Sequence, residues 1–221
     1  MRGFYPQILA PLLTFACLSP IAADAGQPET DRLAQCLAKA EKQADSAYED
    51  GLIWRNQGGG AFAGQCIAVA MIGQGRVEDG AQKLFDLAFA SDAGTEAQRA
   101  ELLAKAGNAW LLVGNAEDAK ASLSKAIEMF PTSGELRLDR ARALLLLSEW
   151  AAAEADLDLT LGKNPLDPLA LRLRAEARLE QGKLEHAQTD VERALEIDAK
   201  DVSTLVLRGT IREALRLKAK G

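Results

Sequence analysis

The chain has few of the groups that build catalytic or metal sites. Its 221 residues include one histidine and three cysteines, and no cysteine has a neighbouring cysteine or histidine at metal-site spacing. His186 is near the start of an expected helix, where we expect it to face solvent. Hydrolases and transferases need a base, a nucleophile or a metal held in a pocket. These shortages favour a protein that is not an enzyme and that needs no cofactor or metal.

An excess of basic residues and long apolar runs are also absent. The net charge is −6, and aromatic residues make up 5% of the chain. Because nucleic acids require a basic surface, these values disfavour DNA or RNA as a partner. No apolar run after the N-terminal one approaches the ~20 residues of a transmembrane helix. We therefore expect no nucleic-acid partner and no stable membrane anchor.

Residues 1–25 have the pattern of a secretory signal peptide. Arg2 provides a positive start, residues 8–18 are apolar, and the alanines on either side of Asp24 mark a cleavage site. The alternative is a lipoprotein signal with Cys17 as the lipidated residue, although the residues before Cys17 form a poor lipobox. The pattern predicts export and removal of this segment.

Cys36 and Cys66 remain after removal of the signal. An even pair in an exported chain suggests a disulfide, which would close a loop of about 30 residues and stabilise the fold by roughly 3 kcal/mol. The alternative is two buried thiols that pack as small apolar groups. Residues 26–60 are expected to form one helix, over 30–56, followed by a glycine turn at 58–60. Phosphate binding would need a strand before these glycines, and no strand is indicated.

The rest of the chain repeats with a period of 34 residues. Four columns mark this period: Gly107, Ala141, Ala175 and Gly209; Gly114, Ser148 and Gly182; Ala119, Ala153 and Ala187; and Ala126, Thr160 and Ala194. A period of this length is typical of stacked helical hairpins, each burying its apolar face on the next. We expect a degenerate repeat over 61–99, full repeats over 100–133, 134–167 and 168–201, and a C-terminal capping helix over 202–221.

Helix starts and ion pairs can be predicted within these repeats. The expected caps are Thr95 with Gln98, Thr132 with Glu135, Asp167 before Pro168, and Asp201. Arginine and aspartate change together at two repeat positions, as Arg140 with Asp156 and as Arg174 with Asp190, while the first full repeat is neutral at both. We expect these residues to form ion pairs across each hairpin, partly exposed and worth about 0–1 kcal/mol each.

These landmarks resemble the tetratricopeptide repeat (TPR) family. One repeat matches the family's motif throughout, with Gly107, Trp110, Gly114, Ala119, Ala126 and Pro131. Later repeats depart from the motif at Ser148, Thr160, Arg178 and Ala199. The resemblance implies an all-α, right-handed solenoid of stacked antiparallel helix pairs. The N-terminal part also resembles exported TPR proteins of Gram-negative bacteria, which implies a periplasmic location.

The resemblance further implies a concave surface that binds a peptide or protein partner. The binding residues it implies are Asn108, Leu112, Leu138, Arg142, Leu146, Arg172, Glu176 and Leu179. The leucines would bury apolar side chains of the partner, and the two arginines would hold a carboxylate. The alternative is that some of these leucines pack between hairpins. Ala104 and Leu138 occupy the positions where lysines of the family's clamp for chaperone C-termini are expected, so that clamp is absent.

Two functions remain open at this point. The first is an adaptor or assembly factor in the bacterial cell envelope that mediates protein–protein interaction. The second is a self-associating structural protein whose end hairpins stack into dimers and which has no peptide ligand. The basic C-terminal end is open to two interpretations, a solvated helix terminus or a contact with membrane phosphates.

Overall fold

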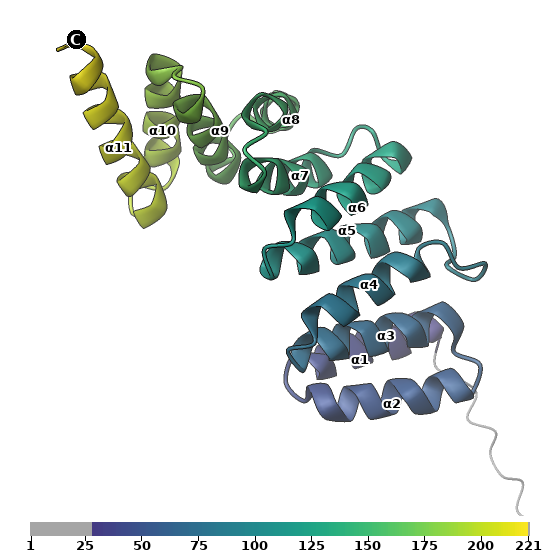
Figure 1. Cartoon of the computed structure of the whole chain (residues 1–221). Helices are drawn as coiled ribbons and strands as arrows, with labels where there is room; N and C mark the ends of the chain where they lie inside the picture. The colour runs from purple at the N-terminus through teal and green to yellow at the C-terminus, as the bar shows by residue number, and fades with distance from the viewer. Residues whose placement is uncertain (1–27, 221) are drawn as a thin grey trace, which may run out of the picture.

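The computed structural model describes residues 28–220, and within this range it contains eleven α-helices and no strand (Figure 1). The helices are α1 (Glu29–Ala40), α2 (Ala44–Asn56), α3 (Gly60–Gly73), α4 (Val77–Leu87), α5 (Glu96–Leu112), α6 (Ala116–Met129), α7 (Gly134–Leu146), α8 (Trp150–Lys163), α9 (Pro168–Glu180), α10 (Leu184–Ile197) and α11 (Val202–Lys218). The expected all-α class is confirmed. The signal-peptide prediction, residues 1–25, lies outside the described residues.

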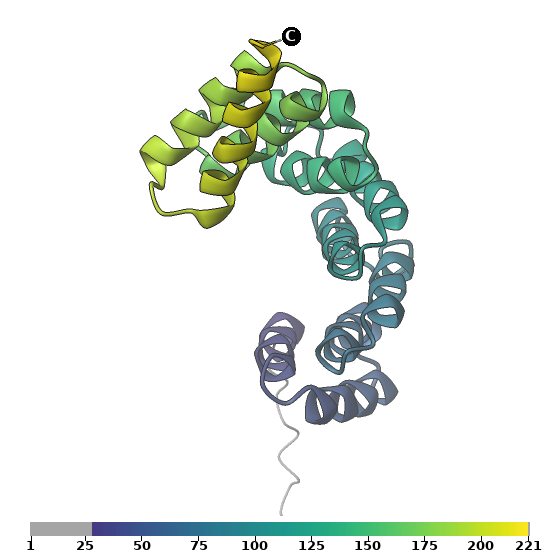
Figure 2. The ribbon, with the colours of Figure 1, turned by 60° about the vertical axis from the view of Figure 1, so that its left-hand side comes forward.

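Consecutive helices pair into hairpins that stack in sequential order. Each helix packs on its neighbours in sequence, and α5, α7, α9 and α11 also contact one another in that order. The result is a curved superhelix with α3, α5, α7 and α9 on its inner side (Figure 2). We call the surface of α5, α7 and α9 on the inside of this curve the concave face. No described helix combines the length and the apolar character needed to cross a bilayer.

The hairpin turns depend on residues with a left-handed backbone. Gly114 and Gly182 have φ of 76° and 71°, a region that glycine enters without a steric penalty. Ser148 holds the same turn in the middle repeat with φ 60° and is the only non-glycine residue in this region among the described residues. The three turns predicted from the repeat are therefore confirmed, with local strain at the serine.

The helix starts agree with the predicted caps at three of four sites. Thr95 and Gln98 form a capping box, and Asp167 and Asp201 cap α9 and α11. The expected cap at Thr132 is wrong by one residue. Ser133 is the N-cap of α7, and its hydroxyl accepts a hydrogen bond from Leu136 N at 3.3 Å. Both residues can cap a helix, and sequence alone did not separate them.

Small residues let the two helices of each hairpin approach closely. A Cβ on Gly107 would lie 2.6 Å from Leu123 of α6, and the equivalent Ala141 and Ala175 are fully buried. Leu123, Leu157 and Val191 fill the space around them and are also fully buried. The core of the solenoid is therefore the continuous seam between its inner and outer helices.

The N-terminal segment differs from the prediction. Residues 30–56 form two helices, α1 and α2, rather than one. The break falls at Glu41–Gln43, where no glycine or proline signals a turn. Gly73 on α3 explains the arrangement, because a Cβ there would lie 2.9 Å from both the Ala40 carbonyl oxygen and the Ala44 side chain. The missing side chain lets this turn pack directly on α3.

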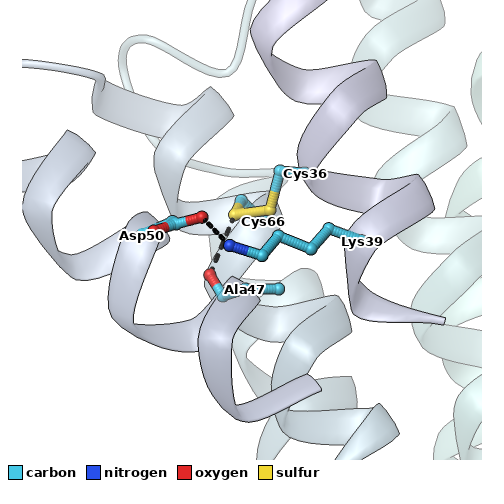
Figure 3. The surroundings of a disulfide bond; sticks show 5 residues. All are labelled: Cys36, Lys39, Ala47, Asp50 and Cys66. Carbon is cyan, nitrogen blue, oxygen red and sulfur yellow. Dashed lines mark hydrogen bonds and ion pairs between the residues drawn. A yellow bond between two sulfur atoms is a disulfide. The ribbon is translucent and has the colours of Figure 1, made fainter. Parts of the chain in front are cut away.

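Cys36 of α1 and Cys66 of α3 lie in disulfide geometry in the interior of this N-terminal unit (Figure 3). Their Cα atoms are 5.8 Å apart, and both side chains are buried. A disulfide between them would connect α1 directly to α3, although α2 lies between these helices in sequence. Lys39 of α1 and Asp50 of α2 form an ion pair beside it. The oxidised state of the two cysteines stays a prediction.

Candidate functional site

Two large leucines are exposed at equivalent positions of neighbouring inner helices. Leu112 at the end of α5 is 72% exposed, and Leu146 at the end of α7 is 60% exposed. Since α5 and α7 are in contact, the two side chains belong to adjacent ends of the same layer. Large apolar side chains that are exposed on the same layer are candidates for contact with a partner. These two leucines form the apolar part of the candidate site.

The other candidate leucines contribute more to packing. Leu138 and Leu179 are partly buried. Leu138 packs against a hydrophobic cluster that spans α7 to α10, and Leu179 packs against one formed by α9, α10 and α11. Leu145 is buried, and Leu111 packs at the edge of the core between α3 and α7. The alternative interpretation, in which some leucines pack between hairpins, therefore describes this second group. Leu112 and Leu146 remain free to contact a partner.

Polar side chains on α5 and α7 form a short chain of contacts. Asn108 Nδ2 donates a hydrogen bond to Asp139 Oδ2 at 2.8 Å, and Arg142 Nη1 lies 3.5 Å from Asp139 Oδ1. Asn108 Oδ1 is buried and accepts no hydrogen bond from any described residue. Burial of an acceptor without a hydrogen-bond donor is destabilising.

Arg172 lies further along the concave face, on α9. Its Nε is 3.7 Å from Asp201 Oδ2, the carboxylate that caps α11. Burial raises the pKa of the neighbouring Glu176, and the charge of Arg172 opposes this shift. Both candidate arginines therefore already face a carboxylate of their own chain, because Arg142 has Asp139. A partner carboxylate would share these arginines rather than neutralise an isolated charge.

The surface between the hairpins contains two separate hollows rather than one continuous pocket. Leu138 lines the first, of about 380 Å³, together with Glu135 and Lys163. Arg172 lines the second, of about 180 Å³, together with Leu169. The structure thus brings Asn108 and Arg142 together through Asp139, and it places Leu138 and Arg172 in different hollows.

A further hollow at the N-terminal end was not predicted. It measures about 340 Å³ and lies between α1, α3 and α5, lined in part by Leu33, Phe62 and Leu102. It depends on the packing of α1 against α3, for which the expected Cys36–Cys66 pair was the sequence signal. Asp92 shapes one edge by accepting a hydrogen bond from Ala61 N at 2.9 Å, and Gly60 makes room for that carboxylate.

The predicted ion pairs are confirmed at both positions. Arg140 Nε donates to Asp156 Oδ2 at 2.7 Å, and Arg174 Nε donates to Asp190 Oδ2 at 2.8 Å. The expectation that these pairs are partly exposed is wrong for the aspartates, since both carboxylates are buried. Each aspartate also has a second arginine, one turn of helix away from the first. Comparison of the repeats with one another predicted the ion pairs but not the burial of the two aspartates.

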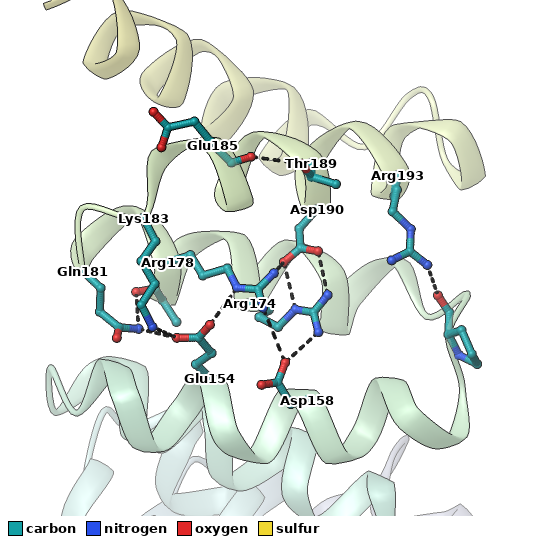
Figure 4. A network of polar contacts seen from close by, with 12 residues as sticks. Glu154, Asp158, Arg174, Arg178, Gln181, Lys183, Glu185, Thr189, Asp190 and Arg193 are labelled. Carbon is teal, nitrogen blue, oxygen red and sulfur yellow. Dashed lines mark hydrogen bonds and ion pairs between the residues drawn. The ribbon is translucent and has the colours of Figure 1, made fainter. Parts of the chain in front are cut away.

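Additional charges extend the second pair into a network that joins two hairpins (Figure 4). Arg178 of α9 binds both Asp190 of α10 and Glu154 of α8, and Arg174 also binds Asp158 of α8. Burial by itself would raise the pKa of Glu154, but hydrogen bonds from Lys183, Arg178 and Gln181 outweigh it and lower that pKa to about 2. The network fixes α9 between its outer neighbours and so positions Arg172 and Glu176 on the concave face.

His186 is exposed on α10, as expected. No three histidine, cysteine, aspartate or glutamate side chains among residues 28–220 gather as a metal site requires. The features that stand out are therefore a curved surface and its exposed side chains.

Comparisons with known proteins point to one family. Residues 111–177 match the tetratricopeptide repeat family. The first TPR domain of the human RPAP3 protein, solved by NMR, is 30% identical with a TM-score of 0.52, and the match covers 55% of this chain and 96% of that domain. The first TPR of Spaghetti (RPAP3) bound to HSP90 peptide SRMEEVD is equally similar, at 30% identity and a TM-score of 0.52 over 54% of this chain and 95% of that one.

Two further similarities are more limited in what they show. Human RNA polymerase II-associated protein 3 is 32% identical over 103 residues, which is 47% of this chain but only 16% of that protein. This chain therefore spans about one sixth of that relative. MamA from Desulfovibrio magneticus RS-1 has a TM-score of 0.59 over 72% of this chain and 93% of its own, at 17% identity, which shows a common fold.

Proposed function

Because this chain belongs to the tetratricopeptide repeat family, we propose that it is a scaffold without catalytic activity that binds a peptide or protein partner on its concave face. The observation that carries this proposal is the pair of exposed leucines, Leu112 and Leu146, beside the linked polar residues Asn108 and Arg142. The complex of the first TPR of Spaghetti with an HSP90 peptide supports peptide binding for a chain that is 30% identical.

The ligand chemistry follows from the side chains available. Leu112 and Leu146 favour a partner with apolar side chains spaced to reach two adjacent helix ends. Ala104 and Leu138 occupy the positions where the family's chaperone clamp would have lysines, so we do not extend the HSP90 peptide to this chain. Arg142 and Arg172, each already close to one carboxylate, favour a single acidic group in the partner over a run of them.

The setting that we propose is the periplasm of a Gram-negative bacterium, where the protein would be an adaptor or assembly factor. Residues 1–25 support export by their signal-peptide pattern, and an even pair of cysteines at disulfide distance suits an oxidising compartment. Fractionation of cells that express the full chain, with N-terminal sequencing, tests this point. The expected result is a periplasmic protein that begins at Gly26, whereas an uncleaved cytoplasmic protein would refute it.

The binding site is tested in two steps, by photo-crosslinking to capture the partner and by substitutions that measure its affinity. A photo-crosslinking residue at Thr189, an exposed position of the outer helix α10, would be compared in intact cells with one at Arg142 on the concave face. The partner captured from Arg142 is then purified and its affinity for the full chain measured. Leu112→Asp with Leu146→Asp is expected to weaken binding at least tenfold, because each charge removes apolar contact area.

Leu159→Asp is the control for these substitutions. Leu159 is 55% exposed on the outer helix α8 and is similar in size and exposure to the two concave leucines. This variant should bind with unchanged affinity. If it weakens binding while the concave double substitution does not, the partner uses the outer surface and the proposal is wrong.

A further inference from the structure

The last helix, α11, has a packing surface that no described residue covers. Its Gly209 is the fourth member of the small-residue column formed by Gly107, Ala141 and Ala175. Those three residues are buried against the second helix of their hairpins. A Cβ on Gly107 would lie 2.6 Å from Leu123, whereas a Cβ on Gly209 would have no atom within 4 Å. The position suited to a close helix contact is therefore open on α11.

An arginine beside this glycine also lacks its counterpart. Arg208 is one repeat beyond Arg174, as Arg174 is one repeat beyond Arg140. The two earlier arginines bind buried aspartates at 2.7–2.8 Å on the second helix of their own hairpins. Arg208 forms no ion pair or side-chain hydrogen bond with a described residue. The helix thus repeats the cationic half of a contact that is complete in the two preceding repeats.

The apolar positions around Arg208 are uncovered in the same way. Leu103 and Leu171 are fully buried in their hairpins, while the equivalent Leu205 is only partly buried. Val202, at the start of α11, is 71% exposed. The opposite side of α11 is covered by the rest of the solenoid, because Ile211 is fully buried against α9 and α10. Val202, Leu205, Arg208, Gly209 and Arg212 form what we call the open face of α11.

The charge of this helix indicates what could cover it. Residues 202–221 contain five basic residues and one acidic residue, whereas the whole chain has a net charge of −6. Two copies of α11 packed together would bring like charges into contact. A helix that carries carboxylates would instead provide the charge that α11 lacks.

We propose that the open face of α11 is a docking surface for an acidic amphipathic helix of a partner protein. In this arrangement a carboxylate of the partner binds Arg208 as Asp190 binds Arg174, and a neighbouring apolar residue packs over Gly209. The contact of α10 with α9 is the structural template for the complex. The proposal does not depend on ligand binding to the concave face.

The template supplies a probe for the first test. A peptide with the sequence of residues 183–198 covers α10 and includes Asp190. Titrated into the isotopically labelled full chain, it is expected to shift the amide signals of residues 202–212. The peptide with Asp190→Asn should bind about fivefold or more weakly, because a charge-assisted hydrogen bond is lost.

Substitutions in the protein assign the contact to named residues. Arg208→Gln should weaken binding by the same factor and should make the two peptides bind equally. Lys218→Gln removes the same charge from α11 but alters a residue that pairs with Glu185 of α10, so it should leave the difference between the peptides unchanged. Gly209→Leu should abolish binding without loss of stability, since the position is open.

Three results would overturn the proposal. Signal shifts at Leu138 and Arg142 without shifts on α11 would place the peptide on the concave face. Equal binding of both peptides to the unaltered chain would remove the role of Arg208. Concentration-dependent shifts of residues 202–212 in the absence of peptide, with dimers seen in sedimentation, would mean that a second copy of the chain covers this face.

Discussion

Arg174 donates two hydrogen bonds to the buried carboxylate of Asp190, from Nε to Oδ2 at 2.8 Å and from Nη2 to Oδ1 at 2.7 Å. The two residues belong to different helices of one hairpin, and Arg178 adds a third bond to the same carboxylate. This pair differs from a surface ion pair, because the carboxylate is withdrawn from water and solvent cannot easily replace a lost partner.

Asp190→Ala should therefore destabilise the protein strongly. The substitution leaves two arginines in a partly buried site without their shared carboxylate, and the expected loss is about 3–5 kcal/mol in the free energy of unfolding. Urea denaturation followed by circular dichroism measures it. Asp158→Ala is the control, since Asp158 binds Arg174 from an exposed position and its loss should cost about 1 kcal/mol or less. Equal effects of the two substitutions would contradict the assigned burial.

The stability of the network should also depend on pH through Glu154. Its folded-state pKa of about 2 is below the ordinary value of 4.5. A lowered pKa contributes stability that is complete above about pH 4.5 and is lost as the pH falls toward 2. Glu154→Gln should thus lower the free energy of unfolding by roughly 2–3 kcal/mol at pH 7 and by much less near pH 2.

The control for this pH dependence is Glu128→Gln on α6. Glu128 is exposed and forms no ion pair with a described residue, so its replacement should change stability little at any pH. Parallel urea titrations between pH 2 and pH 7 would compare the two variants. A difference between Glu154→Gln and the unaltered protein that stays constant over this range would contradict the lowered pKa.

The repeat could be predicted in detail because its physical requirements recur every 34 residues. Small residues are needed wherever two helices cross closely, so Gly107, Ala141 and Ala175 appear at one position and identify the hairpins. The ion pairs could also be predicted, since Arg140 and Arg174 change in step with their aspartates. The burial of those aspartates could not be predicted, because it depends on how consecutive hairpins cover each other.

The N-terminal unit and the candidate site were harder to predict. The turn between α1 and α2 has no glycine of its own, and the residue that permits it, Gly73, is about 30 positions away in sequence on α3. On the concave face, repeat position identified Leu112 and Leu146 as surface residues. It could not reveal Asp139, which links Asn108 to Arg142, because that link depends on side-chain conformations in two helices.

Oxidation of Cys36 and Cys66 is a prediction that mass spectrometry can check directly. Protein exported to the periplasm should lack two hydrogens relative to the reduced chain and should not react with a thiol reagent when unfolded. Replacing both cysteines by alanine should lower the free energy of unfolding by about 3 kcal/mol, because the disulfide closes a loop of 30 residues. Addition of reductant should destabilise the original protein by a similar amount and leave the double variant unchanged. Free thiols in the exported protein would support the alternative of two buried cysteines.

Gly107 and Gly209 give the sharpest contrast between a covered and an uncovered helix. Alanine at Gly107 should destabilise the protein by about 1–3 kcal/mol, because its Cβ would lie 2.6 Å from Leu123 in a closely packed seam. Alanine at Gly209 should instead stabilise it by about 0.5–1 kcal/mol, since α11 gains helix propensity and the new methyl group meets no atom. Urea denaturation of the two variants under identical conditions tests both signs. A destabilising effect at Gly209 would mean that another molecule, such as a second copy of the chain, already covers that face in solution.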